Sequence, residues 1–182
     1  MVDEDKRSKP TRSLSGGFSL DDVVLKPLQN GDYIDIKTSC GELASLIPDL
    51  EDMISKGRNT GLLAFYHDVC IGSIIGTLDV ESTVAANDSP IPLPHVRIFF
   101  LEVNRIYRDH GVGTLLLEEF IERMKQKDIA FIFVSVYTTH VSGWTFFEKF
   151  GFQKEKVLRN QVIMKLSIWS DFGVVSINDI DE

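Results

Sequence analysis

The segment Arg-Asp-His-Gly-Val-Gly-Thr at 108–114 constrains the fold more than any other part of the chain. It separates an apolar run at 96–103 from a run at 112–126 in which apolar residues recur with the period of a helix. Glycines at a strand-to-helix junction let main-chain N–H groups approach an anion closely. The helix adds its unpaired N–H groups and the positive end of its dipole. The segment therefore predicts a strand–turn–helix unit that binds phosphate groups.

Two common phosphate-binding motifs do not fit this segment. A P-loop needs a lysine before its hydroxyl residue, but Thr114 follows Gly113 directly. A dinucleotide fingerprint needs a third glycine three residues after Gly113, where Leu116 stands. The pattern Arg-x-x-Gly-x-Gly therefore indicates another kind of phosphate-bearing ligand.

The remaining patterns predict an alternation of strands and helices. Strands are expected at 23–28, 61–67, 70–80, 96–103, 130–136, 152–158 and 161–168, and helices at 32–39, 42–56, 112–126 and 140–150. Pro48 should break or kink the second helix, and Gly151 should end the last one. The order β-α-α-β-β-β-α-β-α-β-β predicts an α/β fold with a mixed sheet and helices on both faces.

Composition and charge exclude several classes of protein. The 182 residues carry a net charge of −8, which argues against general affinity for nucleic acid. No apolar run has the length of a membrane span, so no membrane contact is expected. Cys40, Cys70 and the four histidines have no metal-ligand spacing, so no metal site is expected. Both cysteines should be buried, in an intracellular protein of the cytoplasm or nucleus.

The chain divides into one domain and two tails. Residues 1–17 are polar and predict a disordered N-terminal tail, residues 18–168 form the domain, and residues 169–182 form an acidic C-terminal tail. Within the domain, the proline-rich stretch at 81–94 predicts a surface loop. No pattern in the chain predicts an oligomeric state.

Four markers, in order, resemble the GCN5-related N-acetyltransferase (GNAT) superfamily over roughly residues 23–168. They are Leu25-Lys26-Pro27-Leu28, Leu101-Glu102-Val103, Tyr107-Arg108 before Gly111-x-Gly113, and Phe146-Phe147-Glu148-Lys149-Phe150-Gly151-Phe152. The resemblance implies the acetyltransferase fold, with 18–168 as an N-acetyltransferase domain. It also implies acetyl-CoA as co-substrate and direct transfer of the acetyl group to a primary amine in a ternary complex.

The resemblance further implies which residues bind the cofactor. Main-chain N–H groups of His110, Gly111, Val112, Gly113 and Thr114 would bind the CoA diphosphate. Arg108 would add a charged contact to phosphate. The pantetheine arm would lie along Leu101 and Val103, and a strand splayed open after Val103 would aim an N–H group at the thioester oxygen.

Two cofactor-binding positions depart from the family's pattern. His140 stands where an asparagine is usual, and Phe147 stands where many members have a proton-donating tyrosine. A phenyl ring at Phe147 can pack against pantetheine but cannot protonate the leaving thiolate. Trp144, Phe146 and Phe150 are expected in the core.

The acceptor amine must lose a proton, because a lysine-like amine has a pKa of about 10.4. The family's base positions fall at Arg97 and near Ser135, which cannot serve. Glu102 is the best remaining carboxylate, since alternation turns it away from its apolar neighbours. Tyr137, at the end of the next strand, is the other candidate. The simpler alternative for Glu102 is a strand carboxylate that faces water or pairs with a lysine.

The acceptor and the activity itself leave alternatives open. A protein or peptide amine is favoured over a small amine, and Glu42, Asp49, Glu51 and Asp52 would either attract such a cation or form a solvated helix face. Arg97 and Phe147 at two catalytic positions motivate the rival hypothesis, a catalytically silent acyl-CoA-binding or scaffolding domain. A nucleotide-binding regulatory domain is a third possibility.

Overall fold

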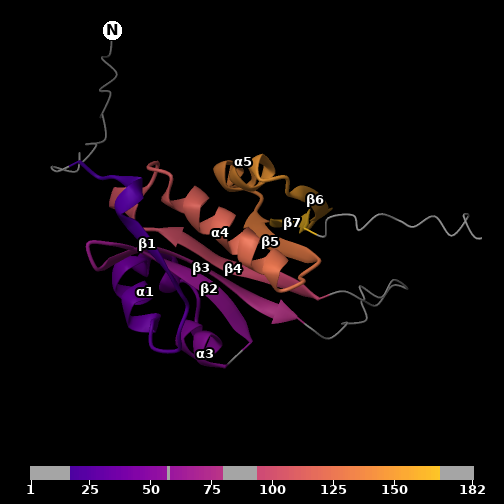
Figure 1. Ribbon diagram of the computed structural model, residues 1–182. Coiled ribbons are helices and arrows are strands. Elements are labelled where there is room, and N and C mark those ends of the chain that lie inside the picture. Colours follow the sequence, from indigo (N-terminus) through magenta and orange to yellow (C-terminus); the bar gives the residue numbers. More distant parts are fainter. Residues whose placement is uncertain (1–16, 57, 80–93, 169–182) are drawn as a thin grey trace, which may run out of the picture.

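The computed structural model describes residues 17–56, 58–79 and 94–168 (Figure 1). Of the N-terminal tail predicted at 1–17, only Gly17 is described. The acidic tail predicted at 169–182 and nearly all of the loop predicted at 81–94 lie outside the described residues.

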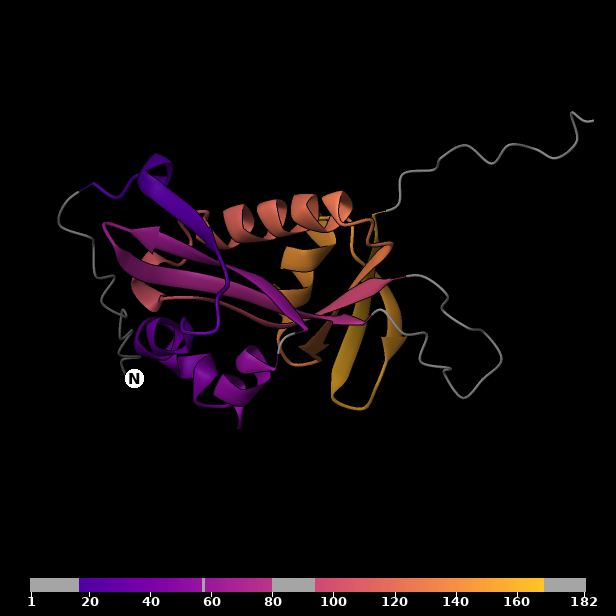
Figure 2. The same cartoon turned by 60° about the horizontal axis from the view of Figure 1, so that its bottom comes forward.

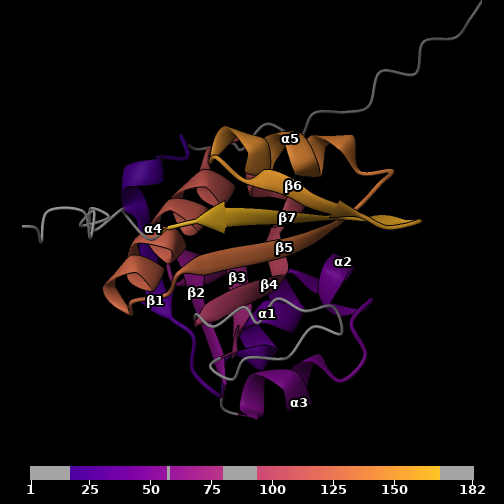
Figure 3. The same ribbon diagram turned by 90° about the vertical axis from the view of Figure 1, so that its right-hand side faces the viewer.

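Strands of the described residues form a seven-stranded sheet in the order β1-β2-β3-β4-β5-β7-β6. They are β1 (Val23–Pro27), β2 (Asn59–Tyr66), β3 (Val69–Asp79), β4 (His95–Val103), β5 (Phe131–Tyr137), β6 (Gln153–Val157) and β7 (Gln161–Ser167). Neighbouring strands are antiparallel except β4 and β5, which are parallel. Figure 3 shows β6, β7, β5 and β4 side by side. The predicted mixed sheet is therefore confirmed.

Helices cover both faces of this sheet, as the sequence predicts (Figure 2). One face carries α1 (Tyr33–Ser39), α2 (Gly41–Ala44) and α3 (Leu50–Ser55), and the other carries α4 (Val112–Gln126) and α5 (Val141–Lys149). The helix expected at 42–56 is two helices, because Pro48 lacks the N–H group that would continue it. There are also two short 3₁₀ turns, η1 (Leu20–Asp22) and η2 (Arg105–Tyr107). η2 directly precedes the segment at 108–114, and Leu20 of η1 lies near Gly111.

Two apolar clusters hold the layers together. Leu116 and Leu117 of α4 lie about one helical turn before Phe120, and all three are buried against β2, β3 and β4. On the opposite face, Ile36 and Ile54 belong to the cluster that α1 to α3 form with the sheet. The sheet is thus fixed from both sides except where two central strands part.

That parting occurs between β4 and β5. The two strands pair only from His95–Ile98 to Phe131–Val134, although both continue for several residues. Phe99 has no partner on β3, because Ile75 pairs with Phe100 and Gly76 with Ile98. Such a bulge bends a strand and redirects the side chains that follow. The opening therefore begins after Ile98, and the expectation that it begins after Val103 is wrong by five residues.

Candidate functional site

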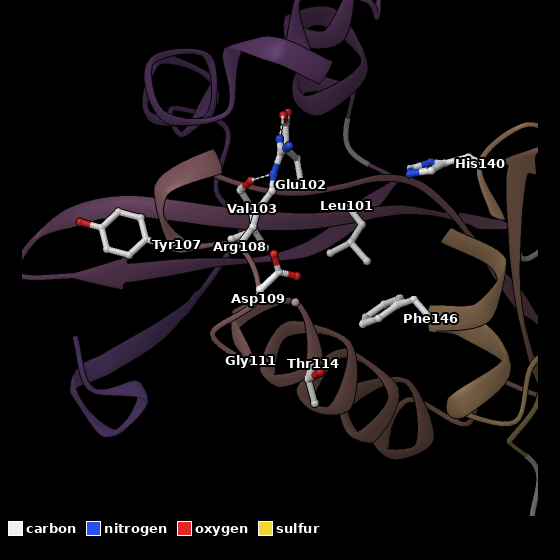
Figure 4. Close-up of a pocket in the computed structure, with 11 residues that line it drawn as sticks. Leu101, Glu102, Val103, Tyr107, Arg108, Asp109, Gly111, Thr114, His140 and Phe146 are labelled. Atoms are coloured by element: carbon white, nitrogen blue, oxygen red, sulfur yellow. Dashed lines mark hydrogen bonds and ion pairs between the residues drawn. The ribbon is translucent and has the colours of Figure 1, made fainter. Parts of the chain in front are cut away.

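Two adjoining cavities follow the open edge of β4. The first, of about 490 Å³, lies between β4, the loop at 104–111 and the first turn of α4, as Figure 4 shows. The second, of about 400 Å³, lies in the gap between β4 and β5 and against α5. They share Leu101, His140 and Phe146 as walls. Together they form a cleft that runs from the N-terminus of α4 into the middle of the sheet.

The main chain of β4 offers hydrogen-bonding groups to this cleft. The N–H of Asn104 donates to Ile71 at 2.8 Å, and Gly72 pairs with Val103 and Ile74 with Leu101. In an antiparallel ladder, residues in this register direct their N–H and C=O groups away from the partner strand. The groups of Leu101 and Val103 therefore point toward the side that β5 has left. An extended ligand would pair with them as an added strand does.

The first turn of α4 ends the cleft. Gly111 is its N-cap with φ of 87°, a left-handed conformation that side chains disfavour. The Leu20 side chain of η1 packs 3.1 Å from where a Cβ of Gly111 would stand. The N–H groups of the first turn have no partners within the helix. Gly111, Gly113 and Thr114 line the first cavity, so these N–H groups and the positive end of α4 face it.

Aromatic packing supports the loop behind the cavity. Phe18 packs against Tyr66, Tyr107 and His110 with ring centroids 4.9–5.4 Å apart. The Nδ1–H of His110 donates to the carbonyl of Arg108 at 2.6 Å. Val112 is buried in the core. The side chains of His110 and Val112 are not on the cavity wall, and a ligand contact through their main chain stays a prediction.

Arg108 lies between two carboxylates. Its Nη2 donates to Glu102 at 3.2 Å and to Glu42 of α2 at 2.8 Å, and its Nε donates to the carbonyl of Val103 at 2.8 Å. In Figure 4 the guanidinium points toward Glu102 and away from Thr114. Contact with a phosphate would require it to leave these partners. The predicted phosphate contact of Arg108 stays a prediction.

Glu102 projects from the opposite face of β4 to Leu101 and Val103, as the alternation predicts. Only 7 % of Glu102 is exposed, and Ser73 is its cross-strand neighbour. It pairs with Arg108 at 3.2 Å. Burial favours the neutral acid, whereas the guanidinium favours the carboxylate. Arg108 occupies Oε1 of Glu102, so proton transfer to that oxygen requires Arg108 to move.

The second cavity brings β5 residues to the cleft. Tyr137 ends β5 with 60 % of its surface exposed, and its carbonyl accepts a hydrogen bond from Trp144 Nε1 at 3.2 Å. Tyr137 and Ser135 line this cavity, whereas Arg97 does not. Glu102 lines only the first cavity and Tyr137 only the second. The two candidate bases thus line different cavities, which share Leu101 as a wall.

Helix α5 supplies a wall residue that the sequence analysis assigned to the core. Phe146 lines both cavities, and its neighbour Phe147, which is 5 % exposed and packs on Phe152 at 5.2 Å, lines the second. A contact of Phe147 with the cofactor stays a prediction. His140 lines both cavities as well. Adjacent phenylalanines on a short helix look alike in sequence. A Cβ on Gly143 would stand 2.9 Å from Val136 Cγ1, so the glycine lets α5 lie close against β5.

Neither cysteine is a nucleophile at neutral pH. Burial raises the pKa of the Cys40 thiol to about 12 and that of Cys70 to about 11. The thiolate is the reactive form, and it is almost absent from both at pH 7. Cys40 and Cys70 are buried, as predicted. They are absent from both cavity walls.

Two negative observations concern the described residues alone. Within 17–56, 58–79 and 94–168, no three His, Cys, Asp or Glu side chains come together in a way that could hold a metal ion. None of the helices in these ranges has the length and apolarity needed to cross a membrane.

Comparison with known proteins agrees with this geometry. The family model described as acetyltransferase (GNAT) family matches residues 28–152, well over half of the chain. N-alpha-acetyltransferase 60 of Danio rerio is 27% identical over 153 residues, which cover 77% of this chain and 63% of that protein. The chain thus spans less than two thirds of this curated relative.

Solved structures share the fold. Ribosomal-protein-S18-alanine N-acetyltransferase from Escherichia coli superposes with a TM-score of 0.65 at 16% identity, over 81% of this chain and 95% of that one. Naa50 of Arabidopsis thaliana, in complex with the bisubstrate analogue CoA-Ac-MVNAL, gives 0.62 at 23% identity, over 80% and 99%. NAA60 of the same plant, in complex with acetyl-CoA, gives 0.61 at 12% identity, over 80% and 98%.

Proposed function

Since the chain belongs to the acetyltransferase (GNAT) family, we propose that it transfers an acetyl group from acetyl-CoA to a primary amine. One observation carries the proposal. The cleft joins a strand edge whose main-chain groups pair with no neighbouring strand to a glycine-capped helix N-terminus. A cofactor with an amide-bearing arm and a diphosphate is complementary to both parts.

The cofactor lies along this cleft. Its pantetheine amides pair with the main chain of Leu101 and Val103, and its diphosphate meets the N–H groups at 111–114. Phe146 and His140 form the opposite wall. The thioester then lies near the point where β4 and β5 part. There an N–H group of the open edge stabilises the negative charge that develops on the carbonyl oxygen.

Transfer proceeds by direct attack of the amine on the thioester carbon. The amine loses a proton to a base, the tetrahedral intermediate collapses, the C–S bond breaks and CoA leaves as thiolate. Glu102 is the first candidate for the base, acting directly or through water once Arg108 has turned away, and Tyr137 is the second. The protonated, buried state of Cys40 and Cys70 supports direct transfer over an acyl-cysteine intermediate.

The acceptor is an amine of a protein or peptide. A relative named for N-alpha-acetylation and a fold neighbour bound to a CoA–peptide analogue support this part of the proposal. The hairpin between β6 and β7 adds support for an open acceptor side, because only residues 158–160 separate the two strands.

A second candidate function is a catalytically silent CoA-binding domain. Two observations favour it: Glu102 is ion-paired with Arg108, and Phe147 offers no proton to a leaving thiolate. Such a domain would bind acetyl-CoA without releasing CoA in the presence of any amine.

Calorimetric titration with acetyl-CoA, followed by thiol release against amines and peptides, tests both candidates. We expect Glu102→Gln to keep nearly full cofactor affinity and to lower kcat about 10²-fold, the usual weight of general-base catalysis. Tyr137→Phe should then lower it less. Glu118→Gln, at an exposed position on α4, is the matched control.

The outcomes separate the candidates. Amine-dependent thiol release that falls in Glu102→Gln supports the enzyme with Glu102 as base. An unchanged rate in Glu102→Gln removes Glu102 from the mechanism. Binding without release across the panel favours the silent domain, and absence of binding contradicts both candidates.

A further inference from the structure

The charged groups around the first cavity are ill-suited to hold an anion. Its wall carries the carboxylates of Glu102 and Asp109 and one guanidinium, that of Arg108. Because Arg108 is shared between Glu102 and Glu42, its charge is already neutralised there. Asp109 is thus the charged group of the wall that remains uncompensated.

We infer that Asp109 is an affinity-determining residue that weakens the hold of the site on the cofactor diphosphate. This inference rests on the proposed function, since it assumes that the diphosphate binds at the start of α4. Its consequence is faster dissociation of CoA after transfer, because acetyl-CoA and CoA share the same diphosphate.

The backbone fixes Asp109 beside the first turn of α4, where the diphosphate is proposed to bind. Asp109 has φ of 64°, and Gly111, two residues later, has φ of 87°. Both left-handed residues hold the loop in one tight path into α4. The aspartate side chain is short, so its carboxylate cannot move far from this path. Figure 4 shows it between Arg108 and the first turn of α4.

No contact within the described part of the chain offsets the charge of Asp109. Among the residues that the structure describes, neither an ion pair nor a side-chain hydrogen bond includes the Asp109 carboxylate. It is absent from all the bonds that link Arg108, Glu102 and Glu42. A diphosphate bound to the N–H groups of α4 would therefore meet a carboxylate that no cation of the described residues screens.

The size of the effect follows from Coulomb's law. One carboxylate about 6 Å from a diphosphate, in surroundings close to those of water and screened by physiological salt, weakens binding about three- to tenfold. The same term shrinks as salt is added, whereas a change in packing would not.

Asp109→Asn is the decisive variant, because asparagine keeps the size of aspartate and tolerates the left-handed conformation. Asp128→Asn is the matched control. Asp128 also has positive φ, 55°, but it lies beyond the other end of α4. Calorimetric Kd values for acetyl-CoA and for CoA would be measured for the three proteins at about 0.02 M and 0.5 M salt, below and well above physiological ionic strength.

We expect Asp109→Asn to bind both ligands about three- to tenfold more tightly at low salt, with most of the gain lost at high salt. Asp128→Asn should bind as the parent protein does. If the parent protein binds acetyl-CoA and Asp109→Asn binds it equally or less tightly, the inference is overturned while the proposed function stands. If neither protein binds acetyl-CoA, the proposed function fails as well.

Discussion

At the scale of single residues, the two buried thiols make stability depend on pH. The pKa values of Cys40 and Cys70 rise from the ordinary 9.0 to about 12 and about 11 because both side chains are buried. Below pH 9 the thiols are protonated in the folded and the unfolded chain alike, so their ionisation does not change the free energy of unfolding. Above pH 9 the unfolded chain loses thiol protons that the folded chain keeps, and stability falls until the folded pKa values are reached.

Each thiol should lower the free energy of unfolding by up to about 1.4 kcal/mol per pH unit in this window. Urea denaturation at pH 8, 9 and 10 measures the decline. In Cys70→Ala the free energy of unfolding should fall by about 1 kcal/mol less between pH 9 and 10 than in the parent protein. The cavity left by the substitution lowers stability equally at each pH and does not affect this difference. An equally steep decline in the variant would contradict the raised pKa.

Single residues also mark where sequence reasoning succeeds. The alternation of Leu101, Glu102 and Val103 was readable because a strand has a period of two and the polar residue stands alone among apolar ones. The partners of Glu102 were not readable. Arg108 follows it by six residues and Glu42 precedes it by sixty, and only the folded chain brings the three charges together. The position of Asp109 beside the first turn of α4 was not readable either, because it depends on a left-handed φ that aspartate adopts only sometimes.

At the scale of elements, the position of α5 depends on one glycine. A Cβ on Gly143 would stand 2.9 Å from Val136 Cγ1 and 3.3 Å from His140 Nδ1. Gly143→Ala should therefore push α5 away from β5 and carry Phe146 with it. We expect a loss of stability of about 1–2 kcal/mol, since overpacking outweighs the better helix propensity of alanine.

Thermal unfolding and the Kd for acetyl-CoA would both report this shift, with weaker binding expected. Gly41→Ala is the control, because this glycine also lies in a helix and a Cβ there meets nothing within 4 Å. A Gly143→Ala protein as stable as the parent would show that α5 accommodates the methyl group without moving.

Most element positions could be predicted from the chain. The period of α4, the break at Pro48 and the left-handed end at Gly151 are local properties, and local chemistry decided them. The start of the opening between β4 and β5 was placed wrongly because it depends on a bulge. Phe99 is as apolar as its neighbours, and the register between β3 and β4 alone leaves it unpaired.

At the scale of the whole molecule, charge should govern how ligands arrive. The chain has a net charge of −8, and acetyl-CoA is an anion. Added salt screens their repulsion, so the association rate constant for acetyl-CoA should rise severalfold between about 0.02 M and 0.2 M salt. Stopped-flow mixing measures this rate. A cationic peptide acceptor should show the opposite trend in kcat/KM, and a falling association rate for acetyl-CoA would contradict the argument.

The open edge of β4 has a consequence for how such a chain changes over generations. The edge presents N–H and C=O groups, which every residue except proline carries alike. Hydrogen bonding by these groups tolerates almost any substitution that preserves the strand, so the sequence of the strand can change while its hydrogen-bonding groups persist. Solved structures that are 12–23% identical to this chain share its fold. What such chains share is the path of the backbone more than the identity of their residues.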